Sequence, residues 1–178
     1  HFDGRDLLAM SARDLKTLRR QVQFVHQDPF ASLNPRMSVQ ALISEPLDIH
    51  GIGSVASRQQ RVSDLLSLVG LDQSAASKYP HEFSGGQRQR ICIARAIAIE
   101  PKLLVLDEPV SALDVSIQAQ ILNLVNDLKA RLGLTYVLIS HDLSVVKYLC
   151  DQVAVMYLGK FVEQGPAEIV LNNPLHPY

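Results

Sequence analysis

Two short apolar segments on either side of a long amphipathic segment constrain the fold of this chain most strongly. Residues 103–106 read Leu-Leu-Val-Leu and residues 135–139 read Thr-Tyr-Val-Leu-Ile, a pattern typical of buried strands covered on both faces. Between them, residues 116–131 have the spacing of an amphipathic helix that ends at Gly133. A strand, a helix and a second strand in this order predict parallel strands joined by a right-handed crossover.

Further elements extend this alternation toward both ends of the chain. The expected helices cover residues 11–20, 55–69, 86–99 and 142–149, with one more beginning after Ser38. The expected strands cover residues 21–27, 153–157 and 160–163, and the last two are expected to form a hairpin. The sequence therefore predicts an α/β core with a mostly parallel sheet flanked by helices in residues 1–37 and 81–178, and a helical insertion in residues 38–80.

Composition narrows the functional class. The chain has 178 residues, of which 47% are hydrophobic and 20% charged, values typical of a single soluble globular domain. Its formal net charge of -1 gives no electrostatic reason for binding nucleic acid or an anionic membrane. No apolar run approaches the ~18 residues that cross a bilayer. Cys92 and Cys150 are too few and too far apart for a disulfide framework, which favours the cytosol.

The strongest local signal is the segment from Phe83 to Arg90, which reads Phe-Ser-Gly-Gly-Gln-Arg-Gln-Arg. Gly85 and Gly86 have no Cβ, so the backbone N–H groups at this helix start can approach a ligand closely. Ser84 adds a hydroxyl group, and the helix N-terminus adds partial positive charge. A bare Ser-Gly-Gly is more often a helix cap, but the polar residues after it and the segments downstream favour a phosphate site.

Two acidic residues follow the apolar segment 103–106. The carboxyl ends of parallel strands form the edge at which such folds bind ligands, so we expect Asp107 and Glu108 to lie there. Asp107 is suited to holding Mg²⁺ through water, and Glu108 to accepting a proton from an attacking water or orienting it. The competing interpretation is a solvated strand end, which the position after the glycine-rich helix disfavours.

Three weaker signals surround these two segments. Gln27 ends a predicted strand, and its amide oxygen can reach a metal or a water, although such a residue alone is more often a surface residue. Ser111 to Asp114 read Ser-Ala-Leu-Asp, a turn that is otherwise the N-cap region of the next helix. His141 follows a predicted strand, where a histidine is usually structural but can donate a hydrogen bond to a phosphate oxygen.

Five segments resemble conserved motifs of ATP-binding-cassette (ABC) ATPases and follow one another along the chain in the same order. The motifs are the Q-loop, the signature motif, the Walker B strand, the D-loop and the H-loop. These segments are Gln27, residues 84–87, residues 103–108, residues 111–114 and His141. Three more, residues 28–35, 79–83 and 173–178, resemble the dipeptide and oligopeptide importer subfamily. Phe83 replaces the leucine usual in the wider family and keeps an apolar anchor.

The resemblance implies a P-loop NTPase-like core and a dimer in which two nucleotide-binding domains enclose two ATP molecules head to tail. Asp107 would serve Mg²⁺, Gln27 would sense the metal and report to the membrane subunits, and Glu108 would activate the hydrolytic water. His141 would contact the γ-phosphate. The γ-phosphate held by the opposite subunit would be bound by Ser84, Gly85, Gly86 and Gln87. Asp114 would help to couple the two sites across the dimer.

The same resemblance implies a peripheral ATP-hydrolysing subunit of a peptide importer at the cytoplasmic face of the cytoplasmic membrane. Its cofactors would be ATP and Mg²⁺. Its partners would be a second nucleotide-binding domain and transmembrane permease subunits, with no nucleic acid. Residues 38–80 would form the helical subdomain, which docks on the permease near Asp28, Pro29 and Phe30.

One part of the ABC pattern is missing. No stretch matches G-x-x-x-x-G-K-[ST], the loop that cradles the β- and γ-phosphates. We expect this loop, and an aromatic residue that stacks on adenine, to precede His1. On this interpretation the chain is an N-terminally truncated domain that is inactive on its own.

Two other interpretations compete with this one. ABC-type ATPases of DNA maintenance and repair also pair a signature motif with a Walker B strand, but they insert long coiled coils. Here Gln27 and Ser84 are only 57 positions apart, with no sustained heptads. The second alternative is a non-catalytic interaction module, which the intact Asp107-Glu108 pair and His141 disfavour for the parent protein.

Overall fold

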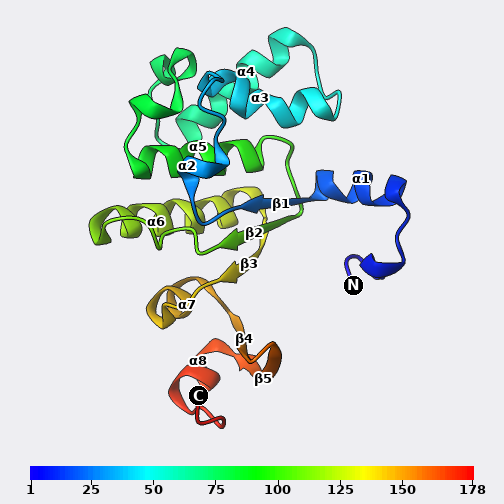
Figure 1. Ribbon diagram of the computed structural model, residues 1–178, viewed down its shortest axis with the longest axis vertical. Coiled ribbons are helices and arrows are strands. Elements are labelled where there is room, and N and C mark those ends of the chain that lie inside the picture. The colour runs from blue at the N-terminus through cyan, green and yellow to red at the C-terminus, as the bar shows by residue number, and fades with distance from the viewer. The chain divides into compact units, whose positions relative to one another are not determined.

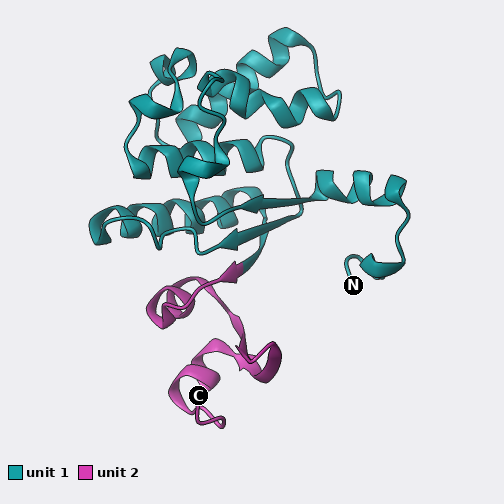
Figure 2. Cartoon of the chain, in the orientation of Figure 1, with its two compact units in different colours: residues 1–137 teal, residues 138–178 magenta.

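The chain divides into two compact units in a computed structural model that describes residues 1–178 (Figures 1 and 2). The first unit comprises residues 1–137 and the second residues 138–178. The α-helices of the first unit are α1 (Ala12–Gln21), α2 (Pro29–Ser32), α3 (Val39–Ile49), α4 (Val55–Leu68), α5 (Gly85–Ile97) and α6 (Val115–Leu132). Three short 3₁₀ helices accompany them: η1 (Leu7–Ala9), η2 (Gln73–Ser77) and η3 (Pro80–Glu82).

The sheet has three strands in the order β1 (Val22–Val25), β2 (Leu103–Asp107) and β3 (Thr135–Ile139). Strands β1 and β2 are parallel, and their register pairs Val22 with Leu103 and Val25 with Leu106. The predicted parallel pairing is therefore confirmed for these two strands. Because the two strands are parallel and their paired residues run without a shift, the carboxyl ends of β1 and β2 lie at the same edge of the sheet.

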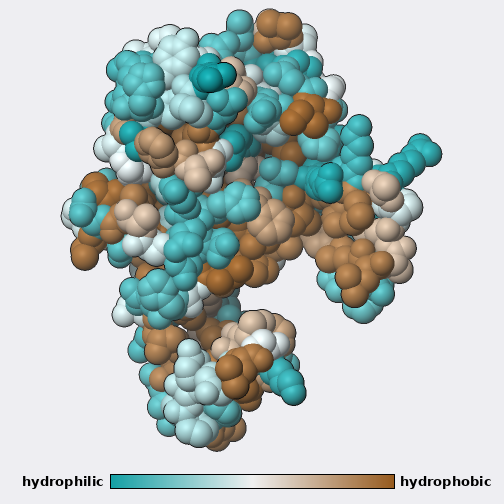
Figure 3. Space-filling model, in the orientation of Figure 1, coloured by the Kyte–Doolittle hydropathy of each residue, from teal (hydrophilic) through white to brown (hydrophobic).

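The sheet is buried less evenly than its sequence indicates. In β2, Leu104 and Leu106 are fully buried, whereas the residues between and beside them are only half-buried. Residues of β3 alternate between exposed and half-buried, and Phe24 in β1 is 51% exposed. In Figure 3 apolar side chains gather over β1 and β2. The prediction of strands covered on both faces is thus wrong, because alternate side chains point to opposite faces and one face of the sheet stays partly exposed in this chain.

Helix α5 is the centre of the first unit. It contacts α2, α3, α4, α6 and β1, and Figure 1 shows it with α3 and α4 on one side and with α6 and the strands on the other. Its apolar residues Ile91, Ile93 and Ile97 are fully buried, and each contributes about 1.5–3 kcal/mol by leaving water. Because this helix begins at the glycine-rich segment, its packing also fixes the position of that segment.

Helices α3 and α4 lie within the predicted helical insertion. The face predicted for α4 is confirmed, because Val62, Leu65, Leu66 and Val69 are at most 2% exposed. Gly70 follows with a φ of +72°, a conformation that glycine adopts without strain and that ends the helix. Residues 38–80 contain no strand, and their assignment to a separate subdomain stays a prediction.

The structure differs from two sequence-based expectations about the first half of the chain. Strand β1 is shorter than the predicted 21–27, because Gln21 still belongs to α1 and the ladder ends at Val25. The expected loop after it contains helix α2. Asp28 caps this helix, since its Oδ1 accepts a hydrogen bond from the Phe30 N–H at 2.8 Å, and Pro29 occupies the first helical position.

The second unit consists of two helices and a hairpin. Helix α7 (Leu143–Leu149) packs against α8 (Ala167–Asn172), which sequence analysis did not predict. Strands β4 (Gln152–Tyr157) and β5 (Lys160–Pro166) pair antiparallel, which confirms the predicted hairpin. Leu158 and Gly159 at its turn have φ values of +48° and +76°, as a two-residue turn that matches the strand twist requires. No helix in either unit combines the length and apolarity that spanning a membrane requires.

The position of Cys92 on α5 predicts its reactivity. Burial raises the pKa of its thiol to about 11, so at pH 8 only about a thousandth of it is thiolate, the nucleophilic form. In the folded protein we expect a maleimide to modify Cys150, which is half-buried, while leaving Cys92 intact. Mass spectrometry of the labelled peptides checks this, with labelling in guanidinium as the control that modifies both. Equal labelling of the two cysteines under native conditions would contradict the burial of Cys92.

Candidate active site at the sheet edge

The register of β1 and β2 brings two predicted site residues together. Gln27 follows Val25 by two residues, and Glu108 follows Leu106, the partner of Val25, by two residues. The Gln27 Nε2 donates a hydrogen bond to the Glu108 Oε2 at 2.8 Å, across 81 positions of sequence. The two side chains therefore meet at the carboxyl edge of the strands, where α/β folds bind ligands.

The turn after β2 holds Glu108 in an unusual backbone conformation. Its φ is +44°, in the left-handed region that non-glycine residues rarely adopt and that is concentrated at functional sites. Ser111 closes this turn, because its N–H and its Oγ both donate to the Glu108 carbonyl oxygen, at 3.2 and 3.1 Å. The Gln27 Nε2 also lies 3.4 Å from the Ser111 Oγ. Sequence analysis placed Ser111 in the turn but did not reveal this link to Gln27.

The oxygen donors at this edge suit Mg²⁺, an ion that takes few protein ligands and completes its coordination with water and phosphate oxygens. Asp107 is the last residue of β2 and is half-buried, and the amide of Gln27 leaves its oxygen as an acceptor. No group of three or more His, Cys, Asp or Glu side chains is arranged to hold a metal ion. Mg²⁺ commonly takes one or two carboxylates and keeps several waters or phosphate oxygens, so this donor set fits it.

The glycine-rich segment forms the N-terminus of α5. Ser84 is the N-cap, and its Oγ accepts from the Gln87 N–H at 3.4 Å while the Gln87 Oε1 accepts from the Ser84 N–H at 3.0 Å. This reciprocal capping box fixes the first turn. Ser84, Gly85 and Gln87 are exposed, so the positive end of a 13-residue helix faces solvent.

The two glycines also have a packing role that their sequence did not indicate. A Cβ on Gly86, which is buried, would lie 2.4 Å from the Cγ2 of Ile117 in α6. A Cβ on Gly85 would lie 3.2 Å from the Cδ2 of Leu113. Gly86 is therefore required by the close approach of α5 and α6, in addition to any approach of a ligand to the backbone.

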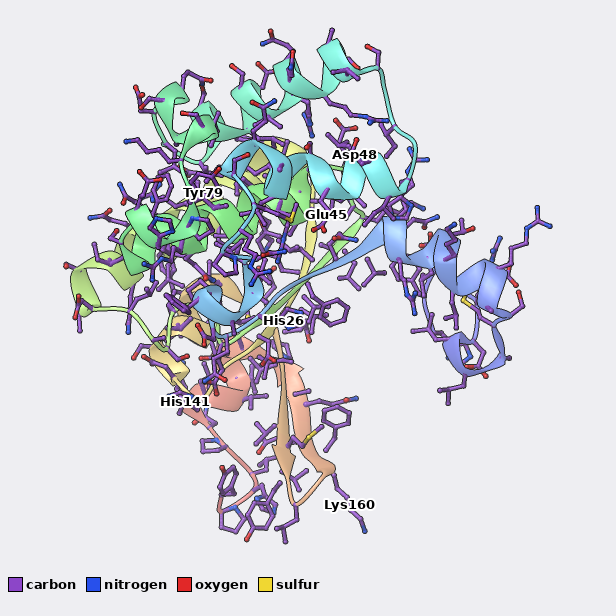
Figure 4. All side chains as sticks on the ribbon, turned by 45° about the horizontal axis from the view of Figure 1, so that its top comes forward. His26, Glu45, Asp48, Tyr79, His141 and Lys160 are labelled. Atoms are coloured by element: carbon purple, nitrogen blue, oxygen red, sulfur yellow. The ribbon has the colours of Figure 1, made fainter.

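Asp114 and His141 occupy turns before helices. Asp114 is the exposed N-cap residue of α6, but its side chain makes no capping hydrogen bond. His141 is exposed and lies in the second unit between β3 and α7, where Figure 4 labels it. The next residue, Asp142, caps α7 by accepting the Ser144 N–H at 2.8 Å. The functional roles predicted for both residues stay predictions.

These features define an α/β fold with polar side chains at the carboxyl edge of a parallel strand pair, and comparison with protein families identifies the family of the chain. The family model described as ABC transporter matches residues 1–111. The chain therefore belongs to the ABC transporter family. This assignment confirms the family resemblance inferred from the order of the five motifs.

Curated relatives refine the comparison. The chain is 54% identical to the oligopeptide transport ATP-binding protein OppF of Bacillus subtilis, covering 99% of this chain and 59% of OppF. It is also 54% identical to a putative peptide import ATP-binding protein of Brucella ovis, covering 99% of this chain and 56% of that protein. The chain thus spans a little over half the length of these relatives.

A solved structure supports the fold. The ATP-binding cassette MJ0796, in a dimeric post-hydrolysis state bound to ADP and Pi, is 27% identical to this chain. The match has a TM-score of 0.80 and covers 94% of this chain and 72% of MJ0796. The predicted fold class, a P-loop NTPase-like core with a mostly parallel sheet, is confirmed.

Proposed function

We propose that this chain is part of the nucleotide-binding subunit of an ABC importer for peptides, and that the whole protein hydrolyses ATP to drive import. The observation that carries the proposal is the contact between Gln27 and Glu108 at the carboxyl edge of β1 and β2, beside Asp107. The peptide-import names of relatives that are 54% identical support the choice of substrate class.

In the proposed reaction, Glu108 accepts a proton from the water that attacks the γ-phosphate, or orients that water. Its hydrogen bond from Gln27 fixes the direction of one carboxylate oxygen, and Ser111 fixes its backbone. Asp107 and Gln27 would hold Mg²⁺, which when bound offsets the negative charge of the phosphates. Phosphoryl transfer of this kind depends mainly on positioning and charge stabilisation, so the geometry of these side chains decides the rate.

The exposed start of α5 is proposed to bind the γ-phosphate of ATP held by a second domain. Its residues Ser84, Gly85, Gly86 and Gln87 offer backbone N–H groups and the positive end of the helix dipole to an anion. Asp114 is proposed to couple the two sites across the dimer, and His141 to donate to the γ-phosphate. The dimeric state of MJ0796 supports a two-domain arrangement.

The proposed membrane partner is a permease that contacts the segment around Phe30. This aromatic side chain is 64% exposed and lies three residues after Gln27, so a partner that binds it contacts the segment that carries Gln27. The proposed location is therefore the cytoplasmic face of the cytoplasmic membrane, as a peripheral subunit. The net charge of -1 gives no support to the alternative of a DNA-maintenance ATPase.

The test uses the full-length protein assembled with its permease subunits in lipid nanodiscs. We expect ATP hydrolysis that stops when EDTA removes Mg²⁺, rises when peptide and its binding protein are added, and does not respond to DNA. Absence of hydrolysis would overturn the proposed activity, and stimulation by DNA in place of peptide would favour the alternative. Because these 178 residues contain no G-x-x-x-x-G-K-[ST] loop, we expect them alone to bind Mg-ATP weakly, which calorimetry measures.

A further inference from the structure

An aromatic and a cationic side chain link α2 to the start of α5. The guanidinium carbon of Arg88 lies 4.8 Å from the centroid of the Phe30 ring, within the ~6 Å at which a cation and an aromatic face attract each other. The Nε of Arg88 donates to the Pro80 carbonyl oxygen at 2.8 Å, which holds the guanidinium in place. Arg88 directly follows Ser84 to Gln87, the residues proposed to bind the γ-phosphate.

Two more side chains of α5 hold the backbone of α2. The Arg95 Nη1 donates to the Ser32 carbonyl oxygen at 2.8 Å, and the Cys92 Sγ lies 3.9 Å from the Pro29 carbonyl oxygen. Positions 88, 92 and 95 share one face of a helix. Helix α2 is therefore attached along two turns of α5, and Figure 1 shows the two helices side by side.

The three contacts differ in the part of α2 that they involve, backbone or side chain. Arg95 and Cys92 contact carbonyl oxygens, which every residue type at those positions of α2 would supply. Arg88 alone contacts a side chain, the exposed ring of Phe30. A partner that displaces this ring therefore acts on Arg88 first, and through it on the turn that contains Ser84 and Gln87.

We propose that Arg88 is a positioning residue that couples Phe30 to the γ-phosphate-binding turn of α5. Gln27 lies three residues before Phe30, so one displacement of α2 reaches both Glu108, through Gln27, and the start of α5, through Arg88. The permease would then move the two halves of the site together. This inference rests on the proposed function, because the permease is the partner that displaces Phe30.

The test is a double-mutant cycle in the full-length protein assembled with its permease. We expect Arg88→Gln and Phe30→Leu each to lower the peptide-stimulated ATPase rate about tenfold, and the double variant to lower it no further. Phe30→Tyr keeps an aromatic face and should retain the stimulated rate. The unstimulated rate of the isolated full-length protein should fall less than the stimulated rate in Arg88→Gln, Phe30→Leu and the double variant, so the ratio of stimulated to unstimulated rates should drop in these three.

Arg90→Gln is the matched control, because the Arg90 guanidinium also contacts a carbonyl oxygen, that of Val69, but does not reach α2. It should keep the ratio of stimulated to unstimulated rates. Losses that multiply in the double variant would overturn the inference. An equal loss of the unstimulated rate would also overturn it, by assigning Arg88 to the chemistry instead.

A second measurement does not depend on ATP hydrolysis. In Arg88→Gln, but not in Arg90→Gln, hydrogen exchange of the full-length protein should be faster at the backbone amides of residues 30–33 and at those of residues 84–87. Unchanged exchange in either segment would overturn the coupling even if the complex hydrolyses ATP. Faster exchange in a complex without hydrolysis would support the coupling and overturn only the proposed activity.

Discussion

Replacing Glu108 with glutamine in the full-length protein is expected to lower ATP turnover by at least about a hundredfold, which corresponds to roughly 3 kcal/mol of transition-state stabilisation. The amide cannot accept the proton of the attacking water. It does keep an oxygen that accepts the hydrogen bond from Gln27, so the sheet edge should keep its arrangement. Mg-ATP affinity should therefore stay within a few-fold of the wild-type value, which calorimetry measures beside the steady-state rate.

Glu100→Gln is a suitable control for this substitution. Glu100 also has a positive φ, +54°, but its side chain is exposed and pairs with Arg61 away from the sheet edge. Its replacement should leave turnover within about twofold of wild type, because exposed ion pairs contribute little. Near-normal turnover in Glu108→Gln would remove Glu108 from its proposed role.

Gly86→Ala is expected to be the second most damaging change. Alanine favours a helix over glycine by up to ~1 kcal/mol, but a Cβ 2.4 Å from Ile117 requires α5 and α6 to separate, at a cost of about 1–3 kcal/mol. The cost of the steric overlap should exceed the gain in helix propensity, because Ile117 is β-branched and its side chain cannot easily rotate away. Denaturant unfolding should therefore show a less stable protein. ATP turnover should fall at least about tenfold as the γ-phosphate-binding turn shifts.

Two further variants separate packing from ligand contact at this position. Combining Gly86→Ala with Ile117→Ala removes the overlap, so this pair should recover part of the turnover lost in Gly86→Ala. Gly85→Ala meets only the end of the flexible Leu113 side chain, at 3.2 Å, and should destabilise the fold less. If Gly86→Ala is as stable as wild type, the close approach of the two helices is not what requires glycine there.

The fold could be predicted well from the sequence because its signals are local. Periodicity or turn chemistry within a few residues predicts the strand at residues 103–106, which β2 extends by one residue, the buried face of α4, and the hairpin turn at Leu158 and Gly159. Helix α2 was missed because Asp28 and Pro29, which interrupt a strand, are also the residues that begin a helix. The half-open face of the sheet was missed because an apolar run does not reveal whether anything covers it.

The candidate site was predictable in its residues but not in its contacts. Motif order singled out Gln27 and Glu108, yet their hydrogen bond follows from the register of two strands that lie far apart in sequence. The contact between Phe30 and Arg88 depends on how α2 rests on α5, and no local pattern encodes it. Likewise, the neighbour that makes Gly86 necessary is Ile117, which belongs to another helix.

In the proposed enzyme each ATP lies between the Glu108 edge of one subunit and the Ser84 turn of another, and a mixed dimer tests this arrangement. One full-length protomer carries Ser84→Arg and its partner carries Glu108→Gln. If the site is shared, one of the two sites is intact, and the mixed dimer should retain about half of the wild-type turnover. Placing both changes in one protomer beside a wild-type partner should abolish turnover. The reverse pattern, in which the dimer is active only when both changes lie in the same protomer, would contradict a site shared between the two subunits.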